Sequence, residues 1–96
     1  MDKNEIIKIL CQYKKEFAEQ YGINKMGIFG SVARNNTNKN SDIDIFVDIS
    51  KPDLFLIAGI KDDLEQRLNT HVDVVTYSKN MNAFLKNRID KESLYV

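Results

Sequence analysis

The stretch Ile28–Asp48, IFGSVARNNTNKNSDIDIFVD, sets Gly30-Ser31 after one short apolar run and Asp42 and Asp44 at the start of the next. In a β-strand, side chains two residues apart leave the same face, about 7 Å apart at the backbone. Aspartate is depleted in strands and neighbouring carboxylates repel each other, so this pair needs a physical reason. A bound cation is one such reason, and the solvated face of an edge strand is the other.

The residues around this pair alternate as a strand that buries one face. One face is apolar and consists of Ile43, Ile45 and Val47. The other face carries the acidic residues and consists of Asp42, Asp44, Phe46 and Asp48. Period-two alternation is typical of a strand that packs on a core on one side only. We therefore predict a strand over residues 42–49, with Asp48 exposed to solvent.

The segments on either side predict a small domain of alternating helices and strands. The first expected elements are a helix from Asp2 or Asn4 to about Gln20, which Gly22 ends, a strand over 25–30 and a helical turn over 31–34. After the strand over 42–49, a helix is expected from Pro52-Asp53 to about Leu68, followed by a strand over 71–77. The last expected helix covers 81–92 and is capped by Ser78 or Asn80. Residues 93–96 either extend the last helix or add a short strand. This order predicts an α/β (α+β) fold, with a small mixed β-sheet flanked by helices, in a single domain over residues 1–96.

Composition and charge narrow the class of protein. The 96 residues are 43% hydrophobic and 29% charged, with 14 basic and 14 acidic side chains that cancel. A chain without net positive charge creates no field that gathers nucleic acid, so we expect no stable nucleic-acid binding. The charged N-terminus lacks the apolar core of a signal peptide, and the apolar run Leu54–Ile60 is too short to span a bilayer. We therefore expect a cytoplasmic protein with no membrane association.

Three further features favour a bound cation over a bare strand edge. Gly30-Ser31 lies at a predicted strand-to-helix turn, where glycine permits close backbone approach and free N–H groups can hold a phosphate. Ten residues separate Ser31 from Asp42, so a hairpin-like return can bring the turn and the carboxylates to one sheet edge. Asp73 lies inside an apolar strand, where a buried carboxylate needs a partner. Three carboxylates beside a phosphate-binding turn are what divalent-metal nucleotidyl transfer requires.

These residues resemble a known family. Gly30-Ser31, ten intervening residues and Asp42-Ile43-Asp44 match the G-S-x10-D-x-D signature of the polymerase β-like nucleotidyltransferase superfamily, and Asp73 matches its third carboxylate. The segments GSVAR and SDIDIFVD are similar to the minimal nucleotidyltransferase (MNT) domains, and the similarity runs over nearly the whole chain. Relatives commonly carry glycine where this chain has Asn35, a residue that tolerates the left-handed backbone conformation.

The resemblance implies an activity, a partner and a set of site residues. MNT proteins are typically the antitoxins of two-gene modules whose toxin is a HEPN-domain ribonuclease, so a hetero-oligomer with that toxin is implied. The implied reaction uses ATP as substrate and transfers AMP to a tyrosine hydroxyl of the toxin. The implied site residues are Asp42, Asp44 and Asp73, as catalytic residues that hold two Mg²⁺ ions, and Gly30, Ser31 and Arg34, as nucleotide-binding residues.

Other interpretations stay open at this point. The same fold could neutralise a toxin by binding alone, or transfer a nucleotide to a small molecule, although relatives of the second kind usually carry an additional substrate-binding domain. Arg34 fits a surface salt bridge as well as a phosphate contact. The helix that starts near Leu54 is apolar nearly all round, which fits either a deeply buried helix or one that docks a partner.

Overall fold

The computed structural model describes residues 2–30, 32–33 and 42–96, and within these ranges the chain forms three helices and four strands. In chain order they are α1 (Lys3–Tyr21), β1 (Ile23–Phe29), β2 (Ile43–Ile49), α2 (Leu54–Leu68), β3 (Val72–Thr76), α3 (Ala83–Glu92) and β4 (Leu94–Tyr95). The last of these settles the alternatives for residues 93–96 in favour of a short strand. None of the helices in the described ranges is long and apolar enough to cross a membrane.

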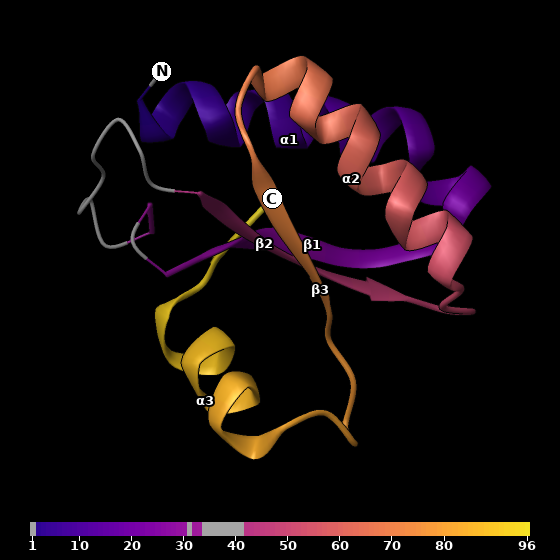
Figure 1. Cartoon of the computed structure of the whole chain (residues 1–96), viewed down its shortest axis with the longest axis vertical. Helices are drawn as coiled ribbons and strands as arrows, with labels where there is room; N and C mark the ends of the chain where they lie inside the picture. Colours follow the sequence, from indigo (N-terminus) through magenta and orange to yellow (C-terminus); the bar gives the residue numbers. More distant parts are fainter. Residues whose placement is uncertain (1, 31, 34–41) are drawn as a thin grey trace.

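The strands form one mixed sheet in the order β3-β2-β1-β4. β1 runs antiparallel to β2 and to β4, whereas β2 and β3 are parallel and joined by α2. Helices α1 and α2 cover one face of this sheet, and α3 lies against the other (Figure 1). This architecture confirms the predicted mixed sheet flanked by helices, and the antiparallel return from β1 brings its end beside the start of β2.

The larger core lies between the sheet and the pair α1 and α2. Ile45 and Val47 of β2 are fully buried there, together with Leu10 of α1 and Leu64 of α2. Each side chain of this kind contributes roughly 1.5–3 kcal/mol when it leaves water. The face of β2 that the alternation predicted to be buried is therefore the face that stabilises the domain.

A smaller apolar cluster lies on the opposite face of the sheet. It consists of Phe29, Phe46 and Ile89, the last of which comes from α3. Gly27 makes this packing possible, because a Cβ at that position would collide with the Leu94 carbonyl and the Phe46 ring. The cluster holds α3 against the same face of β2 that carries the acidic residues.

The first two helices begin where the sequence predicts. Asp2 caps α1 by accepting a hydrogen bond from the Glu5 N–H at 2.9 Å, and Asp53 caps α2 by accepting one from the Phe55 N–H at 2.7 Å. Such caps satisfy backbone donors that have no partner inside the helix. Gly22 ends α1 in the left-handed conformation, with φ of 67°, as its position after the apolar pattern indicates.

The start of α3 corrects the prediction. Asn82 caps this helix by accepting a hydrogen bond from the Leu85 N–H at 3.1 Å, so the predicted caps Ser78 and Asn80 are wrong. The Ser78 carbonyl instead accepts a hydrogen bond from the Met81 N–H at 3.3 Å. These residues form a turn that precedes the helix, and several polar residues in a row leave the sequence unable to say which one is the cap.

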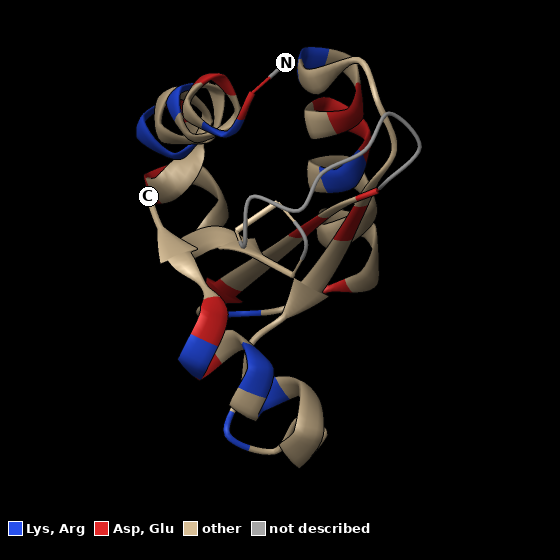
Figure 2. Ribbon diagram, turned by 90° about the vertical axis from the view of Figure 1, so that its left-hand side faces the viewer, with Lys and Arg blue, Asp and Glu red and all other residues tan. Residues whose placement is uncertain are grey.

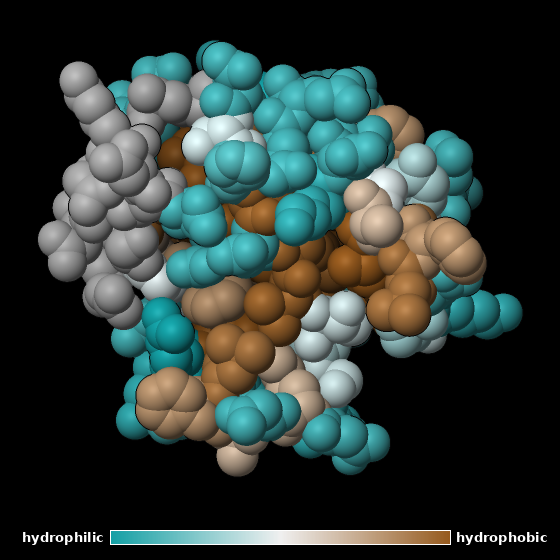
Figure 3. All heavy atoms as spheres, viewed as in Figure 1, coloured by the Kyte–Doolittle hydropathy of each residue, from teal (hydrophilic) through white to brown (hydrophobic). Residues whose placement is uncertain are grey.

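Apolar side chains gather on part of the surface. Figure 3, which has the same view as Figure 1, shows them across the middle of the molecule, where β3 passes between α2 above and α3 below. Leu54 and Phe55, in the first turn of α2, are 87% and 89% exposed. The first two residues of α2 are therefore exposed, whereas Ile60 and Leu64 further along the helix are buried.

Candidate functional site

Two of the predicted catalytic carboxylates lie opposite each other on neighbouring strands. Asp44 of β2 and Asp73 of β3 are register partners in the parallel ladder. Partners of this kind leave the same face of the sheet on strands about 4.8 Å apart. The parallel pairing, which the sequence alone does not specify, is what brings these two residues together.

Asp42 lies at the end of the sheet where this pair begins. It immediately precedes β2 and is exposed. The N–H of the next residue, Ile43, donates a hydrogen bond to the His71 carbonyl at 3.2 Å. Alternation along the strand gives Asp42 the side that Asp44 occupies. The structure therefore places Asp44 and Asp73 in register at one corner of the sheet, with Asp42 directly before the start of β2. The convergence of all three side chains stays a prediction.

Gly30 closes this corner from the side of β1. Its neighbour Phe29 is the register partner of Asp44 in the antiparallel ladder, and Gly30 itself adopts φ of 74°. A Cβ on Gly30 would collide with a carboxylate oxygen of Asp44 and would lie 3.5 Å from Nη2 of Arg88. The backbone conformation therefore favours glycine here, and a larger residue would displace the Asp44 carboxylate.

The segment after Gly30 is only partly described. Ser31 and Arg34, predicted to bind the nucleotide, lie outside the described residues, as does Asn35, so their roles stay predictions. Val32 and Ala33 form a turn, and Val32 is buried in the larger core. This burial anchors the chain directly after Gly30.

Arg88 of α3 lies beside Gly30 at the candidate site, and the sequence analysis did not single it out. Its side chain is 35% exposed, its guanidinium lies 5.8 Å from the centre of the Phe29 ring, and its Nε lies 3.8 Å from a carboxylate oxygen of Glu92. A weak signal was available, because Leu85, Arg88 and Ile89 share one side of a helix. Nothing in the sequence says that this side faces Gly30 and Asp44.

Two acidic residues differ from their predicted exposure. Asp73 is exposed, so the argument that it needs a partner because it is buried is wrong. The reason is that β3 lies at the edge of the sheet. Asp48 was predicted to be exposed but is half-buried, because β2 lies inside the sheet between β1 and β3.

Glu65 of α2 fixes the start of β3, directly before Asp73. Its carboxylate accepts a hydrogen bond from the Val72 N–H at 3.2 Å and lies 3.3 Å from Nδ1 of His71. The Val72 hydrogen bond is the main cause that lowers the pKa of Glu65 below its ordinary value. Glu65 therefore holds the backbone of β3 at the residue that precedes Asp73.

A polar cluster ties another side of α3 to the segment after β3. The Tyr77 hydroxyl donates a hydrogen bond to Asp90 at 2.8 Å, and Lys86 lies 3.2 Å from the second oxygen of the same carboxylate. The Tyr77 hydrogen bond, followed by that of Lys86, lowers the pKa of Asp90, and the same hydrogen bond raises the pKa of Tyr77. Figure 2 shows basic and acidic segments side by side on α3.

The donor set at the corner suits Mg²⁺ in chemical type. Mg²⁺ takes oxygen ligands, and in nucleotide sites it is held by one or two carboxylates together with substrate phosphates. The register pair Asp44 and Asp73 supplies two such carboxylates on one face. Within residues 2–30, 32–33 and 42–96, no group of three or more His, Cys, Asp or Glu side chains is arranged to hold a metal ion by itself. The three-carboxylate ligand set therefore stays a prediction.

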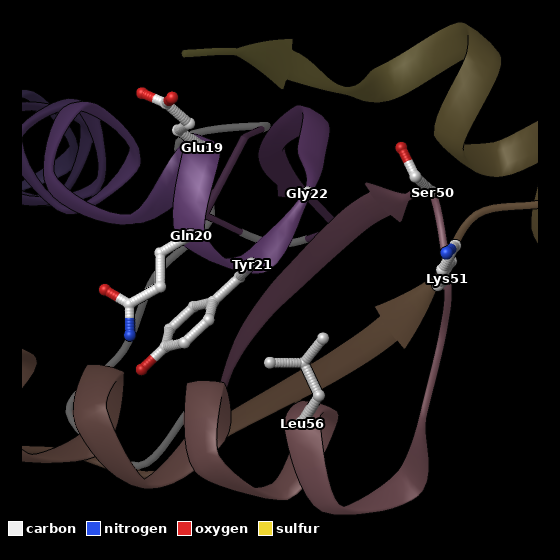
Figure 4. A pocket seen from close by; sticks show the side chains of 7 residues that line it. All are labelled: Glu19, Gln20, Tyr21, Gly22, Ser50, Lys51 and Leu56. Atoms are coloured by element: carbon white, nitrogen blue, oxygen red, sulfur yellow. The ribbon is translucent and has the colours of Figure 1, made fainter.

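A cavity of about 350 Å³ lies at the opposite end of β2 (Figure 4). It opens between the end of α1 and the start of α2, and Tyr21, Lys51 and Leu56 are among its lining residues. Ser50, which directly follows β2, also lines it. The cavity is therefore separated from Asp42 and Asp44 by the length of the strand.

A mixed sheet with a glycine turn facing carboxylates on two adjacent strands defines a domain of the nucleotidyltransferase type. The family model described as a nucleotidyltransferase domain matches residues 10–96. Protein adenylyltransferase MntA from Thermococcus cleftensis is 36% identical over 93 residues, which cover 96% of this chain and 93% of that protein. The chain therefore belongs to the nucleotidyltransferase domain family, within its MntA-type minimal nucleotidyltransferases, as the resemblance in its motifs implied.

Solved structures share the fold over almost the whole chain. The structure of a candidate minimal nucleotidyltransferase matches with a TM-score of 0.79 at 26% identity, covering 98% of this chain and 95% of the other. An MNT antitoxin in complex with a tri-AMPylated HEPN toxin from Shewanella oneidensis contains a chain that matches with a TM-score of 0.63 at 21% identity, covering 97% of this chain and 66% of that one. At this identity, the second match shows the common fold alone.

Proposed function

We propose that this protein is an adenylyltransferase antitoxin that transfers AMP from ATP to a tyrosine hydroxyl of a cognate HEPN-domain toxin. The observation that carries the proposal is the register pairing of Asp44 with Asp73 beside Gly30. The 36% identity to protein adenylyltransferase MntA over nearly the full length of both chains supports the nucleotide and the protein acceptor. The tri-AMPylated toxin bound by an MNT antitoxin of the same fold supports a toxin as that acceptor.

The proposed binding step places the triphosphate of ATP along the turn that follows β1. Gly30 permits the left-handed turn at this point, and N–H groups after it would donate to phosphate oxygens. Asp42, Asp44 and Asp73 would hold two Mg²⁺ ions, with Asp44 and Asp73 contributing from adjacent strands. Bound Mg²⁺ would neutralise charge on the phosphates and lower the pKa of the acceptor hydroxyl.

The proposed transfer step forms one bond and breaks one. The tyrosine oxygen attacks the α-phosphorus in line, the bond from that phosphorus to the bridging oxygen breaks, and pyrophosphate leaves. A free tyrosine hydroxyl has a pKa of about 10, so it needs help to lose its proton near neutral pH. Asp73 is the proposed acceptor of that proton, because its carboxylate is exposed at the edge of the sheet where an incoming side chain can reach it.

The protein acceptor must be delivered by a partner surface. Leu54 and Phe55, exposed in the first turn of α2, offer apolar area for such a contact, and apolar surface of this kind is what protein partners cover. We therefore propose a hetero-oligomer with the toxin. Size-exclusion chromatography of the protein with and without its neighbouring gene product measures this, and two separate peaks would contradict it.

The experiment that tests the activity is co-expression with the neighbouring gene product, followed by mass spectrometry of that product. An AMP adduct on tyrosine is the expected result, and Asp42→Ala or Asp44→Ala should abolish it. Asp48→Ala is the matched control, because it removes a carboxylate further along the same face of β2. A stable complex without any adduct would contradict transfer and favour neutralisation by binding alone.

A further inference from the structure

Arg88 brings a positive charge from α3 to the corner of the sheet where Asp44 and Asp73 stand in register. Its Nη2 lies 3.5 Å from the position that a Cβ on Gly30 would occupy, and an Asp44 carboxylate oxygen lies against that same position. Its helix is held in place by Ile89, which is fully buried against Phe29 and Phe46. The cation is thus positioned by the packing of the next residue in the chain.

The two ends of the guanidinium face different surroundings. Nε faces Glu92, at 3.8 Å from its carboxylate oxygen, and the guanidinium carbon lies 5.8 Å from the centre of the Phe29 ring. Nη2, at the other end, lies beside the Gly30 turn. A guanidinium presents five N–H donors in a planar fork, so contacts at one end leave donors at the other.

We infer that Arg88 is a nucleotide-binding residue, which donates hydrogen bonds from its guanidinium to a phosphate group of ATP held at the Gly30 turn. The inference rests on the proposed function, since it assigns a role within the same site. Planar donor forks match phosphate oxygens in geometry, and charge-assisted hydrogen bonds of this kind are about twice as strong as neutral ones. Partial burial of the Arg88 side chain limits the screening of its charge by solvent.

The charge balance of the corner supports this role. Asp44 and Asp73 stand in register on adjacent strands, and a triphosphate brought beside them adds further negative charge. Like charges at such short range repel, so the site needs fixed positive charge as well as dissolved cations. Among the described residues, Arg88 is a cation whose position beside the Gly30 turn and the Phe29 ring brings it to this corner.

The experiment measures ligand binding by calorimetry, with ATP, inorganic tripolyphosphate and adenosine as probes. Arg88→Met keeps the apolar stem that packs near Phe29 and removes the charge. We expect it to weaken the binding of ATP and of tripolyphosphate about tenfold, with and without Mg²⁺, while adenosine binding is unchanged. Arg88→Lys should recover part of the loss. Lys91→Met is the matched control, because it removes an exposed charge from the last turn of the same helix and should change nothing.

Each other outcome overturns the inference in a distinguishable way. If Arg88→Met binds ATP and tripolyphosphate as tightly as the wild type, Arg88 does not contact phosphate and the proposed transfer function still stands. If the variant loses ATP and adenosine equally and melts at a lower temperature, Arg88 only supports the fold. If the wild-type protein itself binds neither ATP nor tripolyphosphate, the proposed function fails together with the inference.

Discussion

The two faces of β2 perform different tasks within the same seven residues. On one face Ile43, Ile45, Val47 and Ile49 are buried in the larger core. On the other face the same strand presents Asp44 at the candidate site, then Phe46 in the smaller cluster, then Asp48. Because alternate side chains point in opposite directions, stability and chemistry are assigned to different residues of one strand and should respond separately to mutation.

The largest expected effect is on the chemical face. Asp44→Asn keeps the shape of the side chain and removes its charge, so AMP transfer should fall by about a thousandfold, as when a group that stabilises transition-state charge is lost. Stability should change by no more than about 1 kcal/mol. Transfer from α-labelled ATP measures the first and urea unfolding the second. If Asp44→Asn is as active as the control variant Asp48→Asn, the chemical role of this face of β2 is contradicted.

The opposite face should give the reverse result. Ile45 is completely buried, so Ile45→Ala should lower the free energy of unfolding by about 2–5 kcal/mol through lost burial and the cavity left behind. The fraction that stays folded should transfer AMP at the wild-type rate. Urea unfolding followed by activity at a temperature well below the melting point separates the two effects. A large loss of activity in fully folded protein would show that the faces are coupled.

A substitution at Gly30, which lies beside Asp44, tests the geometry of the candidate site, and the same substitution at Gly59 is its control. Gly30→Ala forces a side chain into the left-handed region, at a cost of about 1–2 kcal/mol, and into contact with Asp44. Displacing that carboxylate should lower transfer by about a hundredfold. Gly59 lies in α2 with open space around it, so Gly59→Ala should raise stability by up to about 1 kcal/mol and leave transfer unchanged. Equal activities in the two variants would contradict the role of Gly30.

The smallest expected effect concerns the pH dependence of stability through Glu65. Its pKa is lowered in the folded protein, chiefly by the Val72 N–H. Glu65 therefore contributes stability above its unfolded pKa of about 4.3, and this contribution is lost as pH falls through the folded pKa. Glu65→Gln should be less stable than the wild type at about pH 7, and the difference should shrink as the pH falls below the unfolded pKa of Glu65. Parallel stability curves for the two proteins at all pH values would be inconsistent with this linkage.

Local patterns in the sequence predict much of the fold. The alternation in β2 identifies its buried face, and the pair Pro52-Asp53 identifies the start of α2, because both signals depend only on neighbouring residues. The cap of α3 was misplaced, because Ser78, Asn80 and Asn82 are all good caps and only tertiary packing selects among them.

The candidate site is less predictable than the fold. Gly30, Asp42, Asp44 and Asp73 could be selected from spacing and residue type. The exposure of Asp73 could not, because it depends on which strand lies at the edge of the sheet. Arg88 could not be selected either, since its place beside Gly30 follows from how α3 packs on Phe46 and Phe29, residues distant in the sequence.

The edge position of β3 has a consequence for the size of the acceptor. A carboxylate on the outermost strand can be approached from the side by a residue that is still part of another folded polypeptide. A small molecule, by contrast, gains most from a site that surrounds it and excludes water on all sides. A carboxylate at an open sheet edge is therefore better suited to an acceptor group on a macromolecule than to a small-molecule acceptor.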